Sequence, residues 1–183
     1  MQIDKSTGLL DSAQFIESPN QDDRPIEEPI SLLVIHNISL PPNEFGGPYI
    51  EQLFTNSLNP GEHVFFETIK ELRVSAHLLI RRDGSMIQFV PFHKRAWHAG
   101  ISHFRGREKC NDFSIGIEVE GTDDLAYETI QYKKLAEVTK LILKMYPDIT
   151  LESIQGHCDI APQRKTDPGQ AFDWVYYKSL LSA

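Results

Sequence analysis

Short apolar runs mark the strands that the chain predicts. Residues 31–37 form a run of aliphatic side chains closed by His36 and Asn37, which is typical of a buried strand. Residues 75–80 and 85–90 are β-prone segments on either side of an Asp-Gly pair, a pattern that predicts a hairpin. A shorter strand is expected near residues 151–155.

Strict alternation of apolar with polar or small residues extends over residues 113–121. Side chains of a strand point to opposite faces in turn, so Glu118 lies on the face opposite Ile115, Ile117 and Val119. We therefore expect a strand with one apolar face and one polar face. Glu118 faces either solvent or a polar site.

Helical periodicity is clearest over residues 128–146, where apolar positions form one stripe and Pro147 ends it. Shorter helices are predicted for residues 48–58, with Pro48 in the first turn, and for residues 63–72. A last helix is expected after Pro168-Gly169, with one apolar face made of Phe172, Val175, Tyr176 and Leu180.

These elements predict the α/β class: a single domain with a mixed central β-sheet flanked by helices. A purely parallel sheet is disfavoured, because the hairpin is antiparallel. Residues 1–30 contain three prolines and no sustained periodicity, so we expect an irregular lead-in on the surface. The domain itself is expected to span residues 31–183.

Composition limits the possible partners. The chain of 183 residues is 40% hydrophobic and 24% charged, as in an ordinary globular protein, and its formal net charge is −8. An acidic surface argues against nucleic acid or an anionic membrane as the main partner. With no signal-like start and no long apolar stretch, the sequence favours a cytoplasmic location.

Candidate metal chemistry gathers in residues 156–169. His157 and Asp167 lie ten positions apart among turn-forming residues, which suits a loop that folds back on itself. Imidazole and carboxylate are good zinc ligands, but a catalytic zinc needs a third protein ligand. His36, at the end of its predicted strand, is in the right kind of place. The alternative is a surface loop whose polar residues bond only to turns.

Three other residues, Cys158, His77 and Trp97, are candidates for ligands or site residues. Cys158 adjoins His157, but adjacent residues rarely face one metal, so we favour a packing role for it and a free thiol for Cys110. His77, in the first hairpin strand, is more typical of a packed sheet histidine than of a ligand. Trp97 is either core filler or a flat face for a sugar ring.

A basic run at residues 105–109 is usually solvated surface. In an acidic protein it is also the best local candidate for holding an anionic substrate.

Several separated motifs resemble one family in the same order along the chain. They are Leu33–Asn37, Ser75–Gly84, Arg95–Gly100, Cys110–Glu118 and Gly156–Gly169. Together they resemble the 1,6-anhydro-N-acetylmuramyl-L-alanine amidases of bacterial cell-wall recycling, in the zinc amidase and peptidoglycan-recognition superfamily. The resemblance covers nearly the whole chain beyond residue 30 and implies the fold of that superfamily.

The resemblance also implies roles for individual residues. It makes His36, His157 and Asp167 the ligands of Zn²⁺, Glu118 the catalytic carboxylate and Lys165 its cationic partner. Residues expected to contact an anhydromuropeptide are Asn37, Arg73, Trp97 and Lys109. The family pattern has arginine at position 109, and lysine keeps the charge but lacks the bidentate fork.

The implied reaction is hydrolysis of the amide between the lactyl group of anhydro-N-acetylmuramic acid and L-alanine. The expected partner is this small-molecule substrate, with no nucleic acid, no membrane and no obligate protein partner. Two alternatives stay open at this point. One is a peptidoglycan-binding module without catalysis, and the other is a zinc peptidase, which the lack of a His-Glu-x-x-His motif disfavours.

Overall fold

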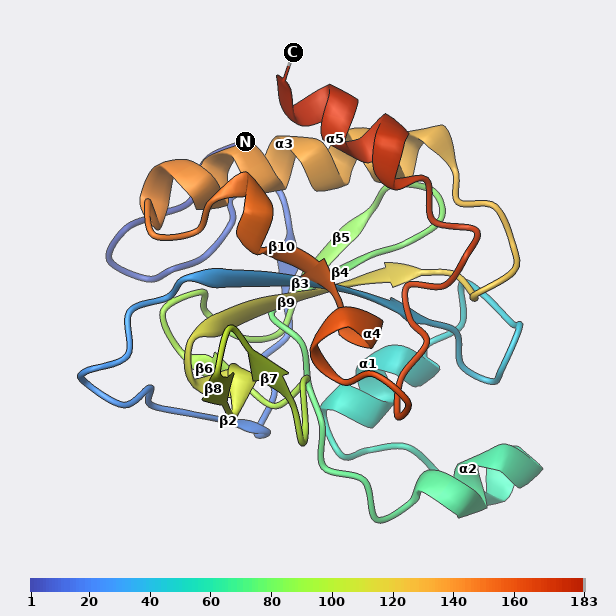
Figure 1. Ribbon diagram of the computed structural model, residues 1–183. Coiled ribbons are helices and arrows are strands. Elements are labelled where there is room, and N and C mark those ends of the chain that lie inside the picture. The colour runs from blue at the N-terminus through green and yellow to red at the C-terminus, as the bar shows by residue number, and fades with distance from the viewer. Residues whose placement is uncertain (183) are drawn as a thin grey trace.

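The computed structural model describes residues 1–182 and has a six-stranded sheet at its centre (Figure 1). The strand order is β1-β5-β4-β9-β3-β10, in which β4 and β5 are antiparallel and the other neighbours are parallel. The predicted mixed α/β class is therefore confirmed. The sheet strands are β1 (Gln14–Phe15), β3 (Leu32–Ile38), β4 (Leu78–Ile80), β5 (Met86–Gln88), β9 (Ser114–Glu120) and β10 (Ile154–Gly156).

Two small antiparallel pairs lie outside this sheet. They are β2 (Gln21–Asp22) with β6 (Arg95–Ala96), and β7 (His103–Phe104) with β8 (Arg107–Glu108). The helices are α1 (Tyr49–Phe54), α2 (Val64–Ile69), α3 (Thr129–Met145), α4 (His157–Ile160) and α5 (Trp174–Ser182), with 3-10 turns at Pro60–Glu62, Cys110–Asp112 and Leu151–Ser153.

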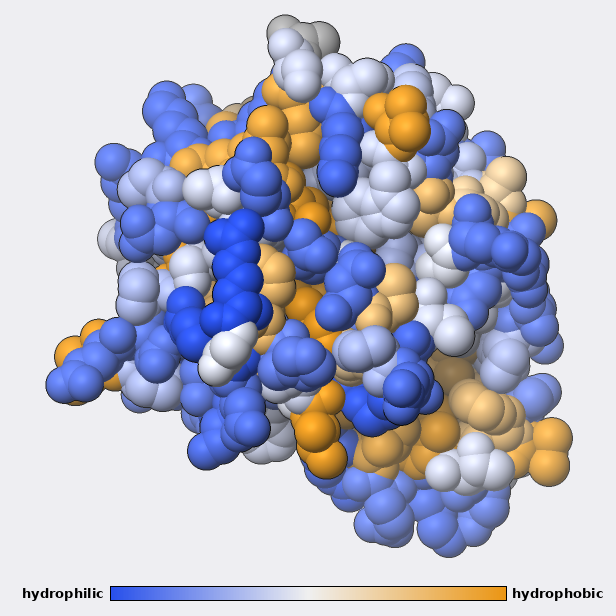
Figure 2. Space-filling view, viewed as in Figure 1, coloured by the Kyte–Doolittle hydropathy of each residue, from blue (hydrophilic) through white to orange (hydrophobic). Residues whose placement is uncertain are grey.

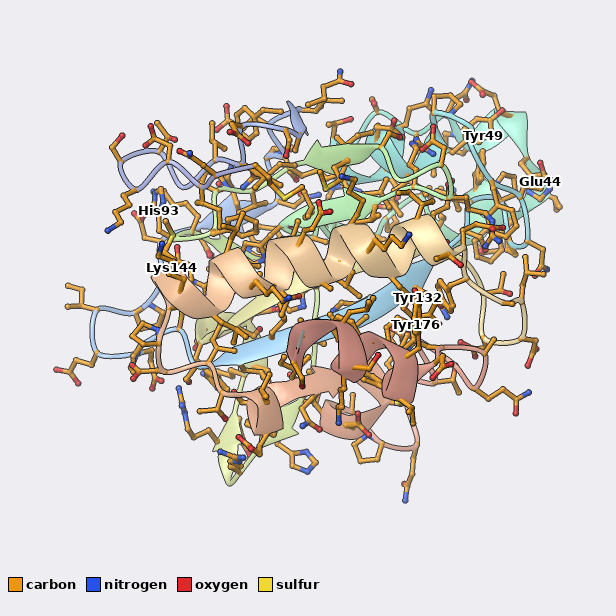
Figure 3. The ribbon with its side chains drawn as sticks, turned by 90° about the horizontal axis from the view of Figure 1, so that it is seen from above. Glu44, Tyr49, His93, Tyr132, Lys144 and Tyr176 are labelled. Atoms are coloured by element: carbon orange, nitrogen blue, oxygen red, sulfur yellow. The ribbon has the colours of Figure 1, made fainter. Side chains whose placement is uncertain are left out.

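Helices α3 and α5 cover one face of the sheet, and α1, α2 and α4 lie on the other side (Figure 1). The main apolar core fills the space under α3 and α5, where Ile115, Ile117 and Val119 of β9 meet Leu135 and Val138 of α3. The two helices also pack on each other, and the rings of Tyr132 and Tyr176 lie 5.3 Å apart between them (Figure 3). This face is the structural side of the domain.

Alternation along β3 and β9 sends polar side chains to the opposite face. Leu33 and Ile35 point to the core under α3, while Leu32 and Val34 pack in a second cluster on the other face. His36 continues that second set, and its register partner on β9 is Glu118. The predicted two-faced character of residues 113–121 is thus confirmed.

Residues 1–30 are mostly irregular and lie largely at the surface, but they are tied to the domain at several points. Strands β1 and β2 pair with β5 and β6, and Leu10 and Asn20 are buried. The Arg24 guanidinium donates hydrogen bonds to the carbonyl oxygens of Asn111, Asp112 and Ser114 at 3.0, 3.1 and 2.7 Å. Two-residue strands and a single partly buried arginine leave no periodic signal, so the sequence did not reveal these attachments. The domain boundary at residue 31 stays a prediction.

Other differences concern the ends of elements. The predicted helices at 48–58 and 63–72 are shorter, and residues 157–160 of the predicted loop form the helical turn α4. Phe172, Tyr176 and Leu180 pack against the core as predicted, but Val175 is 82% exposed and Tyr177 is buried in its place. None of the helices within residues 1–182 combines the length and apolar character needed to cross a membrane.

Candidate active site

Residues of the candidate site lie on, or directly after, three neighbouring parallel strands. They are His36 on β3, Glu118 on β9 and His157 directly after β10. His36 lies near the carboxyl end of β3, and His157 follows the last residue of β10 directly as the first residue of α4. The carboxyl ends of neighbouring parallel strands meet at one edge, where α/β proteins commonly place their sites. The backbone N–H of Cys158 donates to the Asp167 carbonyl at 2.9 Å, and this bond folds the 156–169 segment back on itself.

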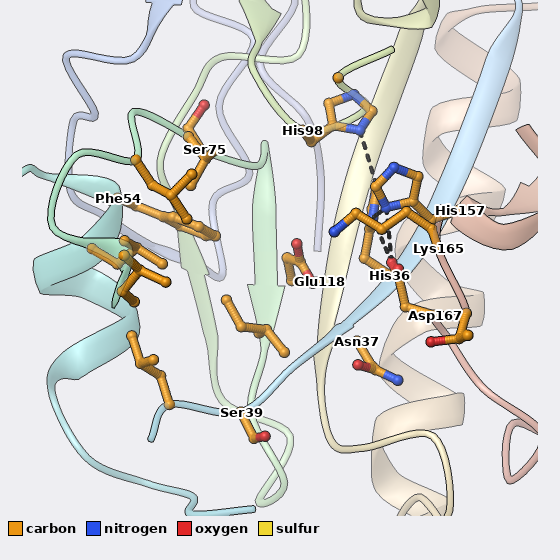
Figure 4. A pocket seen from close by; sticks show the side chains of 18 of the residues that line it. His36, Asn37, Ser39, Phe54, Ser75, His98, Glu118, His157, Lys165 and Asp167 are labelled. Carbon is orange, nitrogen blue, oxygen red and sulfur yellow. Dashed lines mark hydrogen bonds and ion pairs between the residues drawn. The ribbon is translucent and has the colours of Figure 1, made fainter. Parts of the chain in front are cut away.

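Atoms of His36, His157 and Asp167 converge on one point (Figure 4). The two histidine Nδ1 atoms are 3.0 Å apart, and the Asp167 Oδ2 atom lies 2.9 Å from that of His36 and 3.0 Å from that of His157. Both imidazoles are almost fully buried. The sequence therefore placed three distant residues in one cluster correctly, although their role as ligands stays a prediction.

The cluster has the chemistry of a metal site. Around a tetrahedral zinc with bonds of about 2.0–2.1 Å, neighbouring ligand atoms lie roughly 3.3 Å apart, close to the separations found here. The Nε2 atom of His157 lies 3.1 Å from the carbonyl oxygen of Ala99, which needs a proton on Nε2 and leaves Nδ1 as a free lone pair. The residues present thus fit a zinc ion.

Electrostatics keep the cluster in its ligand form. Burial lowers the pKa of His36 to about 4, against the opposing effect of Asp167, so this imidazole is neutral. Burial alone would raise the pKa of Asp167, but its contacts with His157 and His36 outweigh burial and hold that pKa below its usual value. A neutral His36 imidazole and an ionised Asp167 carboxylate are the forms that bind a divalent metal.

Glu118 reaches into the same space from β9 (Figure 4). Its side chain is buried, and burial, followed by the nearby Asp167 charge, raises its pKa well above the usual value, while Lys165 opposes the shift. The Oε2 atom has no hydrogen-bond partner among residues 1–182. A buried carboxyl with an open oxygen and a raised pKa is suited to accepting a proton.

The family model for N-acetylmuramoyl-L-alanine amidases matches residues 26–170. This chain belongs to that amidase family. It is 60% identical over 175 residues to the 1,6-anhydro-N-acetylmuramyl-L-alanine amidase AmpD of Escherichia coli strain K12, with 96% of this chain and 95% of the relative covered. The membership agrees with the resemblance carried by the sequence motifs.

Solved structures give the same result. A crystal structure of a selenomethionine derivative of AmpD matches with a TM-score of 0.95 at 57% identity, covering 99% of both chains. The amidase AmiD of Escherichia coli, in complex with anhydro-N-acetylmuramic acid-L-Ala-D-gamma-Glu-L-Lys, matches with a TM-score of 0.61 at 31% identity. That match covers 86% of this chain and 60% of AmiD.

The candidate ligand cluster of this amidase opens into a pocket of about 890 Å³. Its lining includes the predicted site residues Asn37, Arg73, Trp97, Glu118 and Lys165. Apolar side chains of α1, α2 and nearby segments form another part of the wall: Leu53, Phe54, Phe65, Ile69, Leu72 and Val74. Figure 2 shows apolar residues gathered over α1 and α2 on this face of the molecule. The pocket is large enough for a sugar ring with part of a peptide.

Lys109 is the one predicted substrate residue that does not line this pocket. It borders a neighbouring hollow of about 530 Å³, which shares Gly100 and Arg164 with the larger pocket. Its backbone has a φ of 57°, in the left-handed region. A contact between Lys109 and a ligand in the main pocket therefore requires the ligand to extend past Arg164.

Arg164, His98 and the apolar wall of the pocket had no role predicted from the sequence. Arg164 donates to the carbonyls of Ala99 and Ile101 at 2.6 and 2.7 Å and separates the two hollows, and His98 contacts His36 directly. His98 follows Trp97 in a recognised motif, which was a usable signal. The apolar wall from α1 and α2 gave no such signal, because its residues are ordinary core types.

The preference for packing roles at Cys158 and His77 agrees with the structure. Among residues 1–182, the candidate ligand group comprises only His36, His157 and Asp167. His77 is buried directly before β4, where its Nδ1 accepts a hydrogen bond of 3.0 Å from the Gly116 N–H. Cys158 is half-buried.

Proposed function

We propose that this amidase is a zinc enzyme that hydrolyses the amide between the lactyl group of 1,6-anhydro-N-acetylmuramic acid and L-alanine. The observation that carries the proposal is the convergence of His36, His157 and Asp167 beside Glu118 in one pocket. Near-full-length identity of 60% to an amidase named for this substrate supports the choice of bond. The substrate complex of AmiD supports a small anhydromuropeptide as ligand.

The three candidate ligands and Glu118 have separate roles in the proposed reaction. His36 Nδ1, His157 Nδ1 and Asp167 Oδ2 would hold the zinc. When bound, zinc supplies Lewis-acid polarisation of the scissile carbonyl and lowers the pKa of water to about 7. Glu118 then accepts a proton from the attacking water and returns it to the leaving L-alanine nitrogen.

Lys165 supplies the positive charge in this scheme. It lines the pocket near the metal cluster, and its charge is felt by both His36 and Glu118. Figure 4 shows its side chain reaching over the cluster. A cation at this position stabilises the negative charge that develops on the carbonyl oxygen during hydrolysis.

Asn37, Arg73 and Trp97 are proposed to contact the substrate along the pocket. Arg73 is exposed and donates to the carbonyls of Lys70 and Leu72 at 3.0 and 2.9 Å, which holds its charge at one side of the entrance. Lys109 is proposed to meet only the peptide part, beyond Arg164. A cytoplasmic location and a role in peptidoglycan recycling stay predictions.

A binding module without catalysis is the competing function. It would need no proton acceptor, whereas a buried Glu118 with an unpartnered oxygen has a free-energy cost that mere binding does not explain. The cluster of three candidate ligand residues also favours catalysis. We therefore favour hydrolysis.

Mass spectrometry of products tests the proposal directly. The zinc-loaded protein should convert an anhydromuropeptide into free peptide and anhydro-N-acetylmuramic acid, with the mass of one water added across the two products. A chelator should abolish the conversion, and a muropeptide with a reducing-end sugar should react more slowly. Glu118→Gln loaded with zinc is the matched control. Cleavage at another bond, or none with zinc present, would refute the proposal.

A further inference from the structure

A buried hydrogen-bonded chain leads away from the metal cluster on the side opposite the ligand atoms. The Nε2 atom of His36 lies 2.9 Å from Nδ1 of His98 (Figure 4). The Nε2 atom of His98 lies 3.1 Å from Oγ of Ser114. All three side chains are buried. Both ring nitrogens of His36 therefore have close polar partners.

The direction of the hydrogen bonds follows from the role of His36. If Nδ1 gives its lone pair to a metal, the ring proton must sit on Nε2 and be donated to Nδ1 of His98. His98 then has its own proton on Nε2 and donates it to the Ser114 hydroxyl. Each ring then donates through Nε2 and offers a lone pair at Nδ1, so one tautomer of each ring satisfies both of its contacts.

The polar face of β9 is built around the His98 ring. A Cβ atom at Gly116 would lie 2.5 Å from both Cγ and Nδ1 of His98, so only glycine leaves room for the ring against the strand. Ser114, two residues earlier on the same face, supplies the outer hydrogen-bond partner. The next residue on that face is Glu118.

The backbone that carries His98 is also fixed. The Asn111 carboxamide oxygen accepts hydrogen bonds from the N–H groups of His98 and Ala99 at 3.1 and 2.8 Å. The carbonyl of Ala99 in turn accepts from His157. The short segment His98–Ala99 therefore contacts the outer nitrogens of both histidine ligands.

We propose that His98 is a positioning residue for the metal centre, acting through His36 by holding its Nε2–H and hence its tautomer and ring angle. The inference rests on the zinc site of the proposed function. Partners of this kind typically change metal affinity about 10–100-fold when removed. His98 itself holds no metal in this proposal.

Zinc affinity of purified variants, measured by competition with a chelator, tests the proposal. His98→Leu removes the acceptor and should weaken zinc binding about 10–100-fold. His98→Asn keeps an acceptor oxygen on Cγ, near the place of Nδ1, and should restore most of the affinity. His77→Leu is the matched control, because His77 is equally buried and its ring lies 5.7 Å from that of His98 without a hydrogen bond to His36.

The outcomes separate the two hypotheses. Parent-like zinc affinity in His98→Leu, or an equal loss in His77→Leu, would overturn the positioning role and leave the zinc amidase intact. Absence of zinc binding by the parent would overturn the metal centre and the positioning role together. Weak binding in His98→Leu with rescue by asparagine supports both.

Nuclear magnetic resonance of the zinc-loaded parent gives a readout that needs no variant. Long-range proton–nitrogen correlations of the imidazole rings should show the proton of His36 and the proton of His98 each on Nε2. A proton on Nδ1 of His98 would contradict the proposal, because that atom could no longer accept from His36.

Discussion

Replacing Glu118 by glutamine should make the metal-free protein more stable while it removes most of the activity. The carboxylate is buried, and its Oε2 atom has no hydrogen-bond partner among residues 1–182. An unsatisfied buried polar group costs about 1–3 kcal/mol, and more when it is charged. Glutamine has nearly the same shape and no charge, so it relieves part of this cost.

The stability that Glu118→Gln gains over the parent depends on pH. The pKa of Glu118 is raised in the folded protein, so the folded state holds the proton more tightly than the unfolded state. The parent therefore loses stability as pH rises from the unfolded value of about 4.3 through the raised folded pKa. The advantage of Glu118→Gln should be full above that folded pKa and should vanish below about pH 4.

Thermal unfolding of chelator-treated parent and variant provides the assay. A gain of about 1–3 kcal/mol in a chain of this size raises Tm by roughly 2–12 °C at pH 7.5, since each kcal/mol is worth roughly 2–4 °C. The same variant with zinc should lose about 10²–10⁴-fold in kcat, as expected for a lost general base. A variant that is no more stable than the parent at pH 7.5, or whose advantage persists at pH 4, would refute the reasoning.

Three further predictions concern the ligands, the cation and the peptide contact. Metal analysis should find about one zinc per parent chain, Cys158→Ser should retain it, and most should be lost on alanine substitution of any one ligand, His36, His157 or Asp167. Zinc retention in all three alanine variants would remove the ligand assignment. Lys165→Met should keep zinc but lower kcat about 10²–10³-fold, and an unchanged kcat would exclude a role at the oxyanion. Lys109→Ala should raise KM for tripeptide-bearing substrates but not for the L-alanine derivative, because Lys109 lies outside the main pocket; equal effects on both would place it outside peptide recognition.

The sequence predicted those elements whose signal is local. Strand β9 and helix α3 have long periodic patterns, and the β4–β5 hairpin has an Asp-Gly turn, so their positions were close to those observed. The same alternation placed Glu118 on the site face. His36, His157 and Asp167 could be grouped because a metal needs three ligands and the family motifs supplied the set.

What the sequence did not predict depends on contacts between distant segments. The burial of Arg24 and the pairing of β1 with β5 arise only once the sheet exists. Lys109 was assigned from its charge and its place in a motif, whereas it borders the neighbouring hollow rather than the main pocket. On α5 only Val175 was misassigned, because Tyr177 rather than Val175 meets α3, where its hydroxyl lies 2.8 Å from that of Thr139.

The anchoring of Arg24 has a practical consequence for anyone who shortens or transplants this domain. The family match begins at residue 26, two positions after the arginine that ties the N-terminal segment to the 3-10 turn before β9 and to the first residue of β9. A fragment cut at that limit would lose the guanidinium and leave the carbonyls of Asn111, Asp112 and Ser114 without their donor. Ser114 begins the strand that presents the polar face of the site. A fragment intended to fold and act by itself should therefore include residues 1–30, because the region matched by the family model is shorter than the region that the fold needs.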